Sequence, residues 1–315
     1  MPMFAENRVH QRSSGRPYPN NDYMLTDFFV KTFDNMKYTI NSPNNKWHAE
    51  ISACHGANIT KLQFENQDIL VPFKSEEKYN DNPFIVGSPM LLPANRTYMG
   101  EFKFQGKNYK LPVNDPLKVA NLHGLLYSVP FNVVEKFSNK IVLCYQNNGD
   151  IYPFNFKITV EYLLDDEGLY QRYILANTGD SDMPFTFALH TTFVEPECFM
   201  VPIETCQQKD GNHIPTGKYV DLNDQEKLYT TGSRSKGMVI SGYYRSNGNT
   251  ARIGKYKYTV SEGFDHWVLY NGGGNSEFIC IEPQCGAVNG LNIENGFKIL
   301  SANDKIEFSA FVEKL

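Results

Sequence analysis

The sequence predicts an all-β fold, either a sandwich or a barrel, and three observations lead to this prediction. Short apolar or alternating runs recur along the chain, each bounded by Gly, Asn, Asp or Pro. Helical periodicity is scarce. Aromatic residues make up 14% of the chain, with 22 Phe and 19 Tyr, and these side chains fit pleated, half-buried surfaces. Many short strands with few helices are typical of sandwiches and barrels.

The expected strands follow one another along most of the chain. The segments with strand-like patterns are 48–56, 58–70, 101–112, 131–137, 140–146, 155–177 and 297–314. Three turns are expected between strands: Asp-Asp-Glu-Gly at 165–168, Gln-Gly-Lys-Asn at 105–108, and Asn-Gly-Gly-Gly-Asn at 271–275. The triple glycine has neither GxGxxG nor Walker spacing and no following helix, which favours a hairpin over a phosphate loop.

One large domain is the simplest organisation for the 315 residues. Hydrophobic residues make up 41% and charged residues 21%, as in globular proteins, and no internal repeat is present. Residues 1–22 are polar and rich in Arg, Asn and Pro. We therefore expect a flexible leader over residues 1–22 and a single domain over residues 23–315.

Composition and charge exclude several classes of function. The formal net charge of −5 disfavours nucleic acid and anionic membranes as partners, because both select basic surfaces. No uncharged apolar run reaches the length of a transmembrane helix or a signal peptide. Six cysteines are spread along the chain without a C-x-x-C pair. We expect a cytoplasmic protein with reduced thiols.

Four of the seven histidines lie in segments that suggest no catalytic role. His10 belongs to the expected leader and His213 to a polar loop. His48 and His55 flank an expected strand and have no acidic neighbour in the sequence that would suggest a site. We treat these four histidines as non-catalytic.

The other three histidines have more informative surroundings. His123 lies in NLHGLL, where the following glycine permits an unusual backbone or the close approach of a ligand. His190 lies in the apolar run FALHTTF, where it is either a core histidine or one that faces a cleft. His266 follows Asp265 in GFDHWVLY. If both residues lie in a strand, their side chains face opposite sides of the sheet.

Glu282 and Arg96 are the most informative charged residues. Glu282 ends the apolar run FICIE and precedes a proline, so it is either an exposed residue at a strand end or a partly buried general base. Arg96 lies in GSPMLLPANRTYMGEF, and a fixed guanidinium there suits sugar hydroxyls or a carboxylate. No Cys or His cluster has metal-ligand spacing, and no G-x-S-x-G motif occurs.

Six segments together resemble the aldose 1-epimerases, or galactose mutarotases, in the order that this family shows. The resemblance covers residues 50–295. The segments are Gly56 with NITKLQFENQDIL, GSPMLLPANR, EFKFQGKNYKLPVND with NLHG, FALHTTFVEPE, GFDHWVLYN, and CIEPQCGAVNGLN.

The resemblance implies a fold, a reaction and a site. The fold is a large antiparallel β-sandwich of the galactose mutarotase-like type. The activity is that of an isomerase, the interconversion of the α and β anomers of a free aldohexose, which needs neither a cofactor nor a metal. Glu282 is implied as the general base and His190 as the general acid, while His123, Arg96 and Asp265 bind or orient the sugar. A small-molecule sugar is the expected partner of a monomer or homodimer.

Two departures from the family pattern keep other functions open. The histidine segment reads His-Thr-Thr-Phe, and Pro-Gln-Cys-Gly follows Glu282. The GSPMLLP loop is also similar to relatives that act on hexose 6-phosphates, for which Arg234 and Lys236 could supply cations. A glycosidase that uses Asp265 and Glu282 as its two carboxylates is another alternative. A sugar-binding domain without activity is a third.

Overall fold

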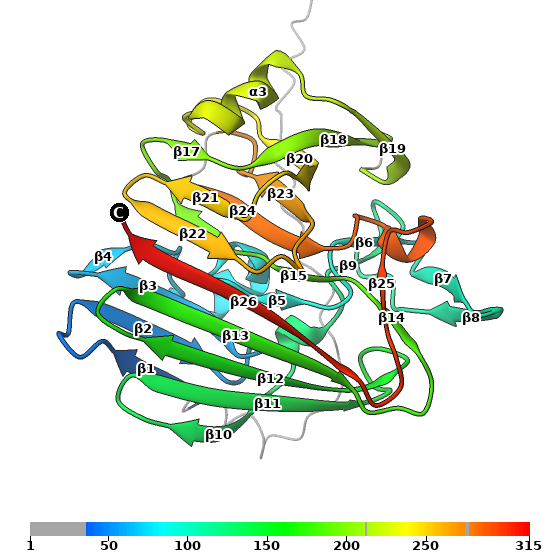
Figure 1. The fold of residues 1–315 in the computed structure, drawn as a ribbon, viewed down its shortest axis with the longest axis horizontal. Helices are drawn as coiled ribbons and strands as arrows, with labels where there is room; N and C mark the ends of the chain where they lie inside the picture. The colour runs from blue at the N-terminus through cyan, green and yellow to red at the C-terminus, as the bar shows by residue number, and fades with distance from the viewer. Residues whose placement is uncertain (1–35, 212, 275–276) are drawn as a thin grey trace, which may run out of the picture.

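Antiparallel strands dominate the computed structural model, which describes residues 36–211, 213–274 and 277–315 (Figure 1). The leader expected over residues 1–22, with His10, lies outside the described residues, as do residues 23–35 of the expected domain. Two large sheets and a four-stranded sheet form the body of the molecule. No helix in the described part of the chain is long and apolar enough to cross a membrane.

The first large sheet has eight antiparallel strands. Along β12 the burial of side chains alternates, because one face of the sheet packs on the core and the other faces solvent. The expected hairpin is confirmed: β12 and β13 pair, and the Asp165 carboxylate accepts the N–H groups of Glu167 and Gly168 at 2.9 Å in the turn. In spatial order the strands are β10 (Asn132–Lys136), β11 (Lys140–Asn148), β12 (Asn155–Leu164), β13 (Gly168–Asn177), β26 (Lys305–Lys314), β22 (Tyr256–Val260), β21 (Thr250–Ile253) and β17 (Phe199–Met200).

The second large sheet carries the strands that matter most for the site. Its strand β24 is buried along almost its whole length, because β23 pairs with one edge and β15 and β16 pair with the other. In spatial order the strands are β19 (Pro215–Asp221), β18 (Ile203–Lys209), β20 (Ser241–Ser246), β23 (His266–Tyr270), β24 (Phe278–Cys285), β15 (Phe187–Leu189) and β5 (Met90–Leu91), with β16 (Thr192–Val194) beside β24.

Smaller elements complete the fold. The four-stranded sheet consists of β1 (Lys37–Asn41), β2 (Trp47–Ser52), β3 (Asn58–Phe64) and β4 (Gln67–Asp68). The two-stranded pairs are β6 (Arg96–Tyr98) with β9 (Ala120–Leu122), β7 (Glu101–Phe104) with β8 (Lys107–Lys110), and β14 (Met183–Phe185) with β25 (Lys298–Leu300). The helices are α2 (Glu76–Asp81) and α3 (Asp224–Thr231), with 3₁₀ turns η1 (Pro83–Ile85), η2 (Leu126–Ser128) and η3 (Gly290–Asn292).

The β7–β8 hairpin has a shorter turn than expected. Only Gln105 and Gly106 lie between the strands, and both have positive φ, at 47° and 80°. Two-residue turns with positive φ at both positions match the right-handed twist of antiparallel strands. Lys107 and Asn108, which we expected in the turn, belong to β8 instead.

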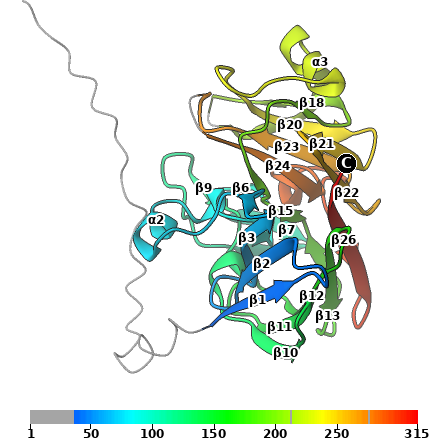
Figure 2. The same cartoon turned by 90° about the vertical axis from the view of Figure 1, so that its left-hand side faces the viewer.

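A single hydrophobic cluster joins the three main sheets. It includes Trp47 from β2, Phe156 from β12, Trp267 from β23 and Phe308 from β26, all fully or almost fully buried. Figure 2 shows β1 and β2 beside β11 and β12, and contacts between β2 and β12 agree with this view. The structure is therefore a β-sandwich of antiparallel sheets, as the sequence predicts.

Phe308 offers a test of this core. Its ring is fully buried and its centroid lies 5.0 Å from that of Phe187 and 5.1 Å from that of Phe264. We expect Phe308→Ala to lower the free energy of unfolding by about 3–5 kcal/mol in urea denaturation, because it leaves a cavity. The matched control is Phe137→Ala, whose side chain is 57% exposed. If Phe137→Ala lowered the free energy of unfolding as much as Phe308→Ala, the assignment of Phe308 to the buried core would be contradicted.

Candidate active site

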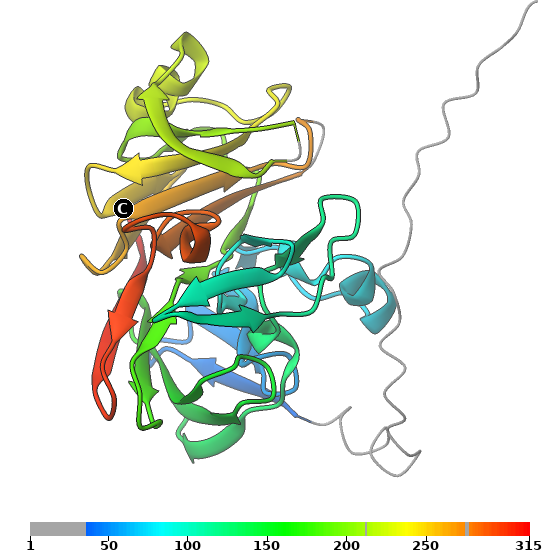
Figure 3. The same ribbon diagram turned by 90° about the vertical axis from the view of Figure 1, so that its right-hand side faces the viewer.

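A cavity of about 280 Å³ lies where β20, β23 and β24 meet the segment around β6 and β9. Figures 1 and 3 show β6 and β9 next to the end of the sheet that carries β23 and β24. Its volume is close to the lower end of small-molecule sites, which span roughly 300–1,000 Å³. The polar residues that line it include Arg96, His123, His190, Tyr243 and Glu282. Four of the five residues implied by the resemblance therefore share one cavity.

Glu282 reaches the cavity from the interior of the second sheet. We placed it at the end of a strand, but β24 continues to Cys285 and includes Pro283. Residues alternate along β24, so Ile281 packs in the core cluster while Glu282 points to the other face. The side chain of Glu282 is therefore almost completely enclosed, with 1% exposed. The alternative of an exposed residue at a strand end is wrong.

His190 lies in a break between β15 and β16. Its backbone N–H donates to the carbonyl of Pro89 at 2.9 Å, which continues the antiparallel register of β15 with β5. Thr191, which follows it, stabilises the backbone at this break through its hydroxyl. The Thr191 hydroxyl bonds the hydroxyls of Ser88 at 2.8 Å and Tyr258 at 2.9 Å. The His-Thr-Thr departure thus has a structural role. The register of β15 and β16 with β24 places His190 opposite Glu282, with Nε2 at 3.3 Å from Oε1.

Pairing of β6 with β9 places Arg96 beside His123. Arg96 pairs with Leu122, and the His123 N–H donates to the carbonyl of Asn95 at 2.7 Å. His123 and Gly124 have positive φ of 65° and 62°. A Cβ atom added to Gly124 would lie 2.0 Å from the carbonyl oxygen of Leu92. The glycine is needed for this close backbone contact, and the resulting turn aims His123 at the cavity.

The Arg96 guanidinium is held on two sides. One amino group donates to the Tyr243 hydroxyl at 3.1 Å, and the other donates to the Asp115 carboxylate at 3.4 Å. The Arg96 side chain is only 17% exposed. The prediction of a fixed guanidinium is confirmed. The residues that fix it come from β20 and from the turn before β9.

Burial shifts the pKa values of the catalytic candidates in opposite directions. It raises the pKa of Glu282 well above its ordinary value, against the attraction of the Arg96 charge. Burial lowers the pKa of His190 to about 4. It also lowers the pKa of His123 well below its ordinary value, and the neighbouring His190 and Arg96 add to this. The site therefore favours uncharged forms of all three groups.

Four buried polar atoms on the residues around this cavity have no hydrogen-bond partner within the described part of the chain. They are Glu282 Oε2, His190 Nδ1, His123 Nδ1 and Arg96 Nε. Buried polar atoms in native proteins usually have a partner. Acceptors and donors that lack one around a single cavity are typical of a site for a ligand rich in hydroxyl groups.

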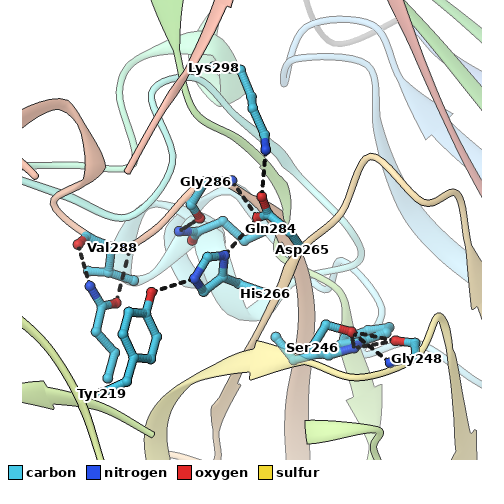
Figure 4. Close-up of polar contacts among 11 residues, drawn as sticks. Tyr219, Ser246, Gly248, Asp265, His266, Gln284, Gly286, Val288 and Lys298 are labelled. Carbon is cyan, nitrogen blue, oxygen red and sulfur yellow. Dashed lines mark hydrogen bonds and ion pairs between the residues drawn. The ribbon is translucent and has the colours of Figure 1, made fainter. Parts of the chain in front are cut away.

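Asp265 does not line the cavity, and its carboxylate already has partners (Figure 4). It contacts His266 Nδ1 at 2.7 Å and Lys298 Nζ at 2.8 Å, and it accepts the N–H of Gly286 at 2.8 Å. His266 Nε2 in turn lies 2.6 Å from the Tyr219 hydroxyl. The sugar-binding role that the resemblance implies for Asp265 stays a prediction that this geometry does not favour.

The expectation that Asp265 and His266 face opposite sides is wrong. β23 begins at His266, so Asp265 lies just before the strand and the alternation of side chains does not extend to it. Burial favours the protonated form of Asp265. The contacts with His266, Lys298 and Gly286 outweigh burial and hold the pKa of this carboxyl well below its ordinary value.

Sequence reasoning missed several residues of the cavity. Tyr243 and Phe84 belong to it, and so do Lys118 and His213, which lie in turns with no motif around them. Only the final geometry brings these positions together. Arg234 and Lys236, proposed as cations for a phosphate, are exposed and do not line the cavity.

One metal-binding arrangement is present among the described residues. Ligand atoms of His190, Cys280 and Glu282 lie within 4.8 Å of one another, and Zn²⁺ accepts nitrogen, sulfur and oxygen ligands. Cysteine binds metals as the thiolate. Burial, followed by the nearby Glu282, raises the pKa of the Cys280 thiol well above its ordinary value. The neutral thiol is thus favoured, and the absence of a metal stays a prediction from the sequence.

The fold and the cavity define a galactose mutarotase-like β-sandwich with a buried carboxylate and histidine at its site. The chain belongs to the aldose 1-epimerase family, whose sequence profile matches residues 36–308. A galactose mutarotase-like protein from Clostridium acetobutylicum has a similar structure, with a TM-score of 0.79 and 22% identity over 86% of this chain and 93% of that one. At this identity the likeness establishes the fold.

Two further relatives are also distant from this chain in sequence. The structure of a putative aldose 1-epimerase from Escherichia coli K-12 has a TM-score of 0.76 and 18% identity, over 89% of this chain and 99% of that one. The uncharacterized protein YihR of Escherichia coli K-12 is 27% identical over 198 residues. That match covers 59% of this chain and 63% of YihR, less than two thirds of this relative.

Asp265→Asn tests whether Asp265 stabilises the fold. At pH 7 we expect it to lower the free energy of unfolding by about 2 kcal/mol, because charged hydrogen bonds to His266 and Lys298 are lost. The folded pKa of Asp265 lies below the unfolded value of about 3.9. The Asp265 carboxylate therefore stabilises the folded protein fully above about pH 4. This stabilisation is lost as the pH falls through the lower pKa that Asp265 has in the folded protein.

Urea denaturation of the wild type and of Asp265→Asn, at pH 7 and at lower pH, measures the difference in their free energies of unfolding. The matched control is Asp224→Asn, whose side chain is fully exposed on α3 and should change stability little at either pH. If the difference in free energy of unfolding between wild type and Asp265→Asn did not become smaller toward low pH, the stabilising role assigned to the Asp265 carboxylate would be wrong.

Proposed function

We propose that the protein is an aldose 1-epimerase that interconverts the α and β anomers of an aldohexose by acid–base ring opening and closure. The observation that supports this most directly is the contact of 3.3 Å between His190 Nε2 and Glu282 Oε1 inside the cavity. Mutarotation requires a base for the C1 hydroxyl and an acid for the ring oxygen. The C1 hydroxyl oxygen and the ring oxygen are both bonded to C1, so a base and an acid that lie next to each other can exchange protons with them.

The reaction conserves one proton on the pair. In the ring-opening step the Glu282 carboxylate takes the proton from the C1 hydroxyl while His190 gives its proton to the ring oxygen. The C1–O5 bond breaks and a C1 carbonyl forms. Rotation about C1–C2 presents the other face of the carbonyl. Ring closure then returns a proton from Glu282 to O1 and one from O5 to His190, which restores the starting pair.

The shifted pKa values suit this cycle. Before opening, the pair is a carboxylate beside an imidazolium, and after opening it is a carboxylic acid beside a neutral imidazole. Burial raises the pKa of Glu282 and lowers that of His190, so it favours the second arrangement. The nearby Arg96 charge favours the carboxylate and partly offsets this preference. We propose that this balance brings the two arrangements closer in free energy.

His123 and Arg96 would bind the sugar without transferring protons. Their Nδ1 and Nε atoms lack partners among the residues described, and both side chains line the same cavity as the pair. A neutral His123 can donate or accept a hydrogen bond, and Arg96 can donate to a sugar oxygen. Such fixed donors stabilise charge that develops on oxygen as the C1–O5 bond breaks.

The geometry disfavours a glycosidase. That chemistry uses two carboxyl groups across the bond to be cleaved. Within the described chain, Glu282 is the only acidic residue that lines the cavity, and Asp265 is bound to His266 and Lys298 elsewhere. A sugar-binding domain without activity would need neither the base nor the acid, and the following experiment separates it from an enzyme.

Substitution of Glu282 tests the proposed base. We expect the wild-type protein to accelerate the decay of optical rotation of fresh α-D-glucose or α-D-galactose, and Glu282→Gln to lose about 100-fold or more of this rate, because general base catalysis is removed. Glu197→Gln is the matched control, because Glu197 is exposed and does not line the cavity. Equal rates for wild type and Glu282→Gln would reject Glu282 as the base.

The pH dependence tests the shared proton. Activity should fall on the acidic side when the pair gains a second proton, with a midpoint near the pKa of about 4 for His190 and well below the ordinary 6.5. It should fall on the alkaline side when the pair loses its only proton, at the raised pKa of Glu282. Polarimetric kcat/KM values from pH 4 to 9 measure both limits. An acidic midpoint between 6 and 7 would contradict a buried pair.

A further inference from the structure

A thiol lies beside the proposed acid–base pair. The ligand atoms of His190, Cys280 and Glu282 all lie within 4.8 Å of one another. Cys280 is fully buried, and its sulfur lies 3.4 Å from Thr192 Oγ1. The proposed reaction uses the histidine and the glutamate and gives the thiol no part. The cluster therefore contains one more chemically active group than mutarotation requires.

The register of neighbouring strands produces this cluster. Cys280 and Glu282 are two residues apart on β24, so their side chains leave the same face of the sheet. Across the ladder, Thr192 of β16 pairs with Cys280. The same register, continued from β15, places His190 opposite Glu282. All three groups are therefore held by strand backbone, which positions a site more precisely than loops do.

The three groups are the three kinds of ligand that Zn²⁺ accepts: an imidazole nitrogen, a thiolate sulfur and a carboxylate oxygen. A thiolate selects zinc-like ions over Mg²⁺ and Ca²⁺, which prefer oxygen ligands. Bonds of about 2.0–2.3 Å place the ligand atoms of tetrahedral zinc roughly 3.3–3.8 Å apart. Since the atoms here already lie within 4.8 Å, shifts of less than about 1 Å for each side chain complete the arrangement.

A divalent cation would leave this buried cluster without net charge. Burial raises the pKa of the Cys280 thiol while no metal is bound, but a coordinated thiol loses its proton outright. The thiolate and the Glu282 carboxylate then balance the two positive charges of the ion. Binding releases the thiol proton and the proton that Glu282 and His190 share. The nearby Arg96 charge opposes a cation, but it is paired with Asp115 at 3.4 Å.

The cavity gives a cation access to the cluster. Glu282 and His190 line the cavity of about 280 Å³, and Cys280 adjoins them from within the sheet. Glu282 Oε2 is buried and has no hydrogen-bond partner among the described residues, so it is available to a ligand. Three protein ligands leave the fourth position of a tetrahedral ion for water or another small molecule, and this position faces the cavity.

We propose that His190, Cys280 and Glu282 form an inhibitory site for one Zn²⁺ ion or a similarly thiophilic divalent cation. The ion would occupy the carboxylate and the imidazole nitrogen that exchange the proton with the sugar, and it would displace that proton. Inhibition rests on the proposed function, whereas binding of the metal does not. The two parts can therefore be tested separately.

Titration of the chelator-treated protein with Co²⁺ tests binding, because a cobalt–thiolate bond gives a charge-transfer absorption band that nitrogen and oxygen ligands do not give. We expect the band to saturate at one equivalent of Co²⁺ and to disappear when Zn²⁺ displaces the cobalt. Cys280→Ser should abolish the band. It should also weaken Zn²⁺ binding by about 100-fold or more, since loss of an outer-shell contact alone costs roughly 10- to 100-fold.

Cys198→Ser is the matched control, because this thiol is exposed and lies outside the cluster. It should keep both the band and the affinity for Zn²⁺. Glu282→Gln retains the thiol but loses a charged ligand, so it should weaken Zn²⁺ binding and tests the cluster even if Cys280→Ser does not fold. A wild type without the thiolate band, or a band that persists in Cys280→Ser, would overturn the site.

Polarimetry with added Zn²⁺ tests inhibition, with each variant compared with its own rate in the absence of metal. Wild type and Cys198→Ser should lose activity over the Zn²⁺ concentrations that displace Co²⁺, and Cys280→Ser should need about 100-fold more. Full activity of the wild type at saturating Zn²⁺ would overturn the inhibition. A cobalt–thiolate band that is lost in Cys280→Ser supports the metal site even if no sugar is turned over, in which case only the proposed function fails. Turnover without such a band would overturn the metal site alone.

Discussion

The site depends on a carboxyl group that the fold buries in the middle of a sheet. Glu282 lies on β24, which β23 covers on one edge and β15 and β16 cover on the other. A charge in such a place is costly unless a partner stabilises it or the group binds a proton. Burial favours the protonated form of Glu282, the nearby Arg96 charge acts in the opposite direction, and His190 Nε2 lies 3.3 Å from the carboxyl oxygen. Burial raises the pKa of Glu282 and lowers that of His190, so it favours a single shared proton on the carboxyl group over one on the imidazole.

Strand register and one irregular turn bring the two histidines to this carboxyl group. His190 lies where β15 stops and β16 begins, and the Thr191 hydroxyl binds Ser88 and Tyr258 across the break. His123 lies in a turn with positive φ that only the close packing of Gly124 against Leu92 permits. A regular strand would direct every second side chain into the core. The register of β15 and β16 with β24 is continuous across the break and places His190 opposite Glu282, whereas His123 reaches the same cavity from a turn.

Much of the fold and part of the site could be predicted from the sequence, for physical reasons that differ. Alternating burial along β12 and β13, with the Asp165 turn between them, is encoded locally and was predicted correctly. The place of Glu282 was not, because a proline after it reads as a strand end although β24 continues through Pro283. Tyr243, Lys118 and His213 could not be found, since they come from separate turns and strands that only the tertiary structure brings together.

The cavity thus combines two regions of different origin. Glu282 and His190 come from the buried strands of a sandwich whose fold distant relatives share at 18–22% identity. Lys118 and His213 come from turns, whose sequence can change with little effect on the core. Arg96 connects the two regions, because Asp115 from the turn before β9 and Tyr243 from β20 bind its guanidinium, and its charge acts on Glu282. A change in these turns can therefore alter the charge near Glu282 while the buried strand that carries Glu282 stays in place.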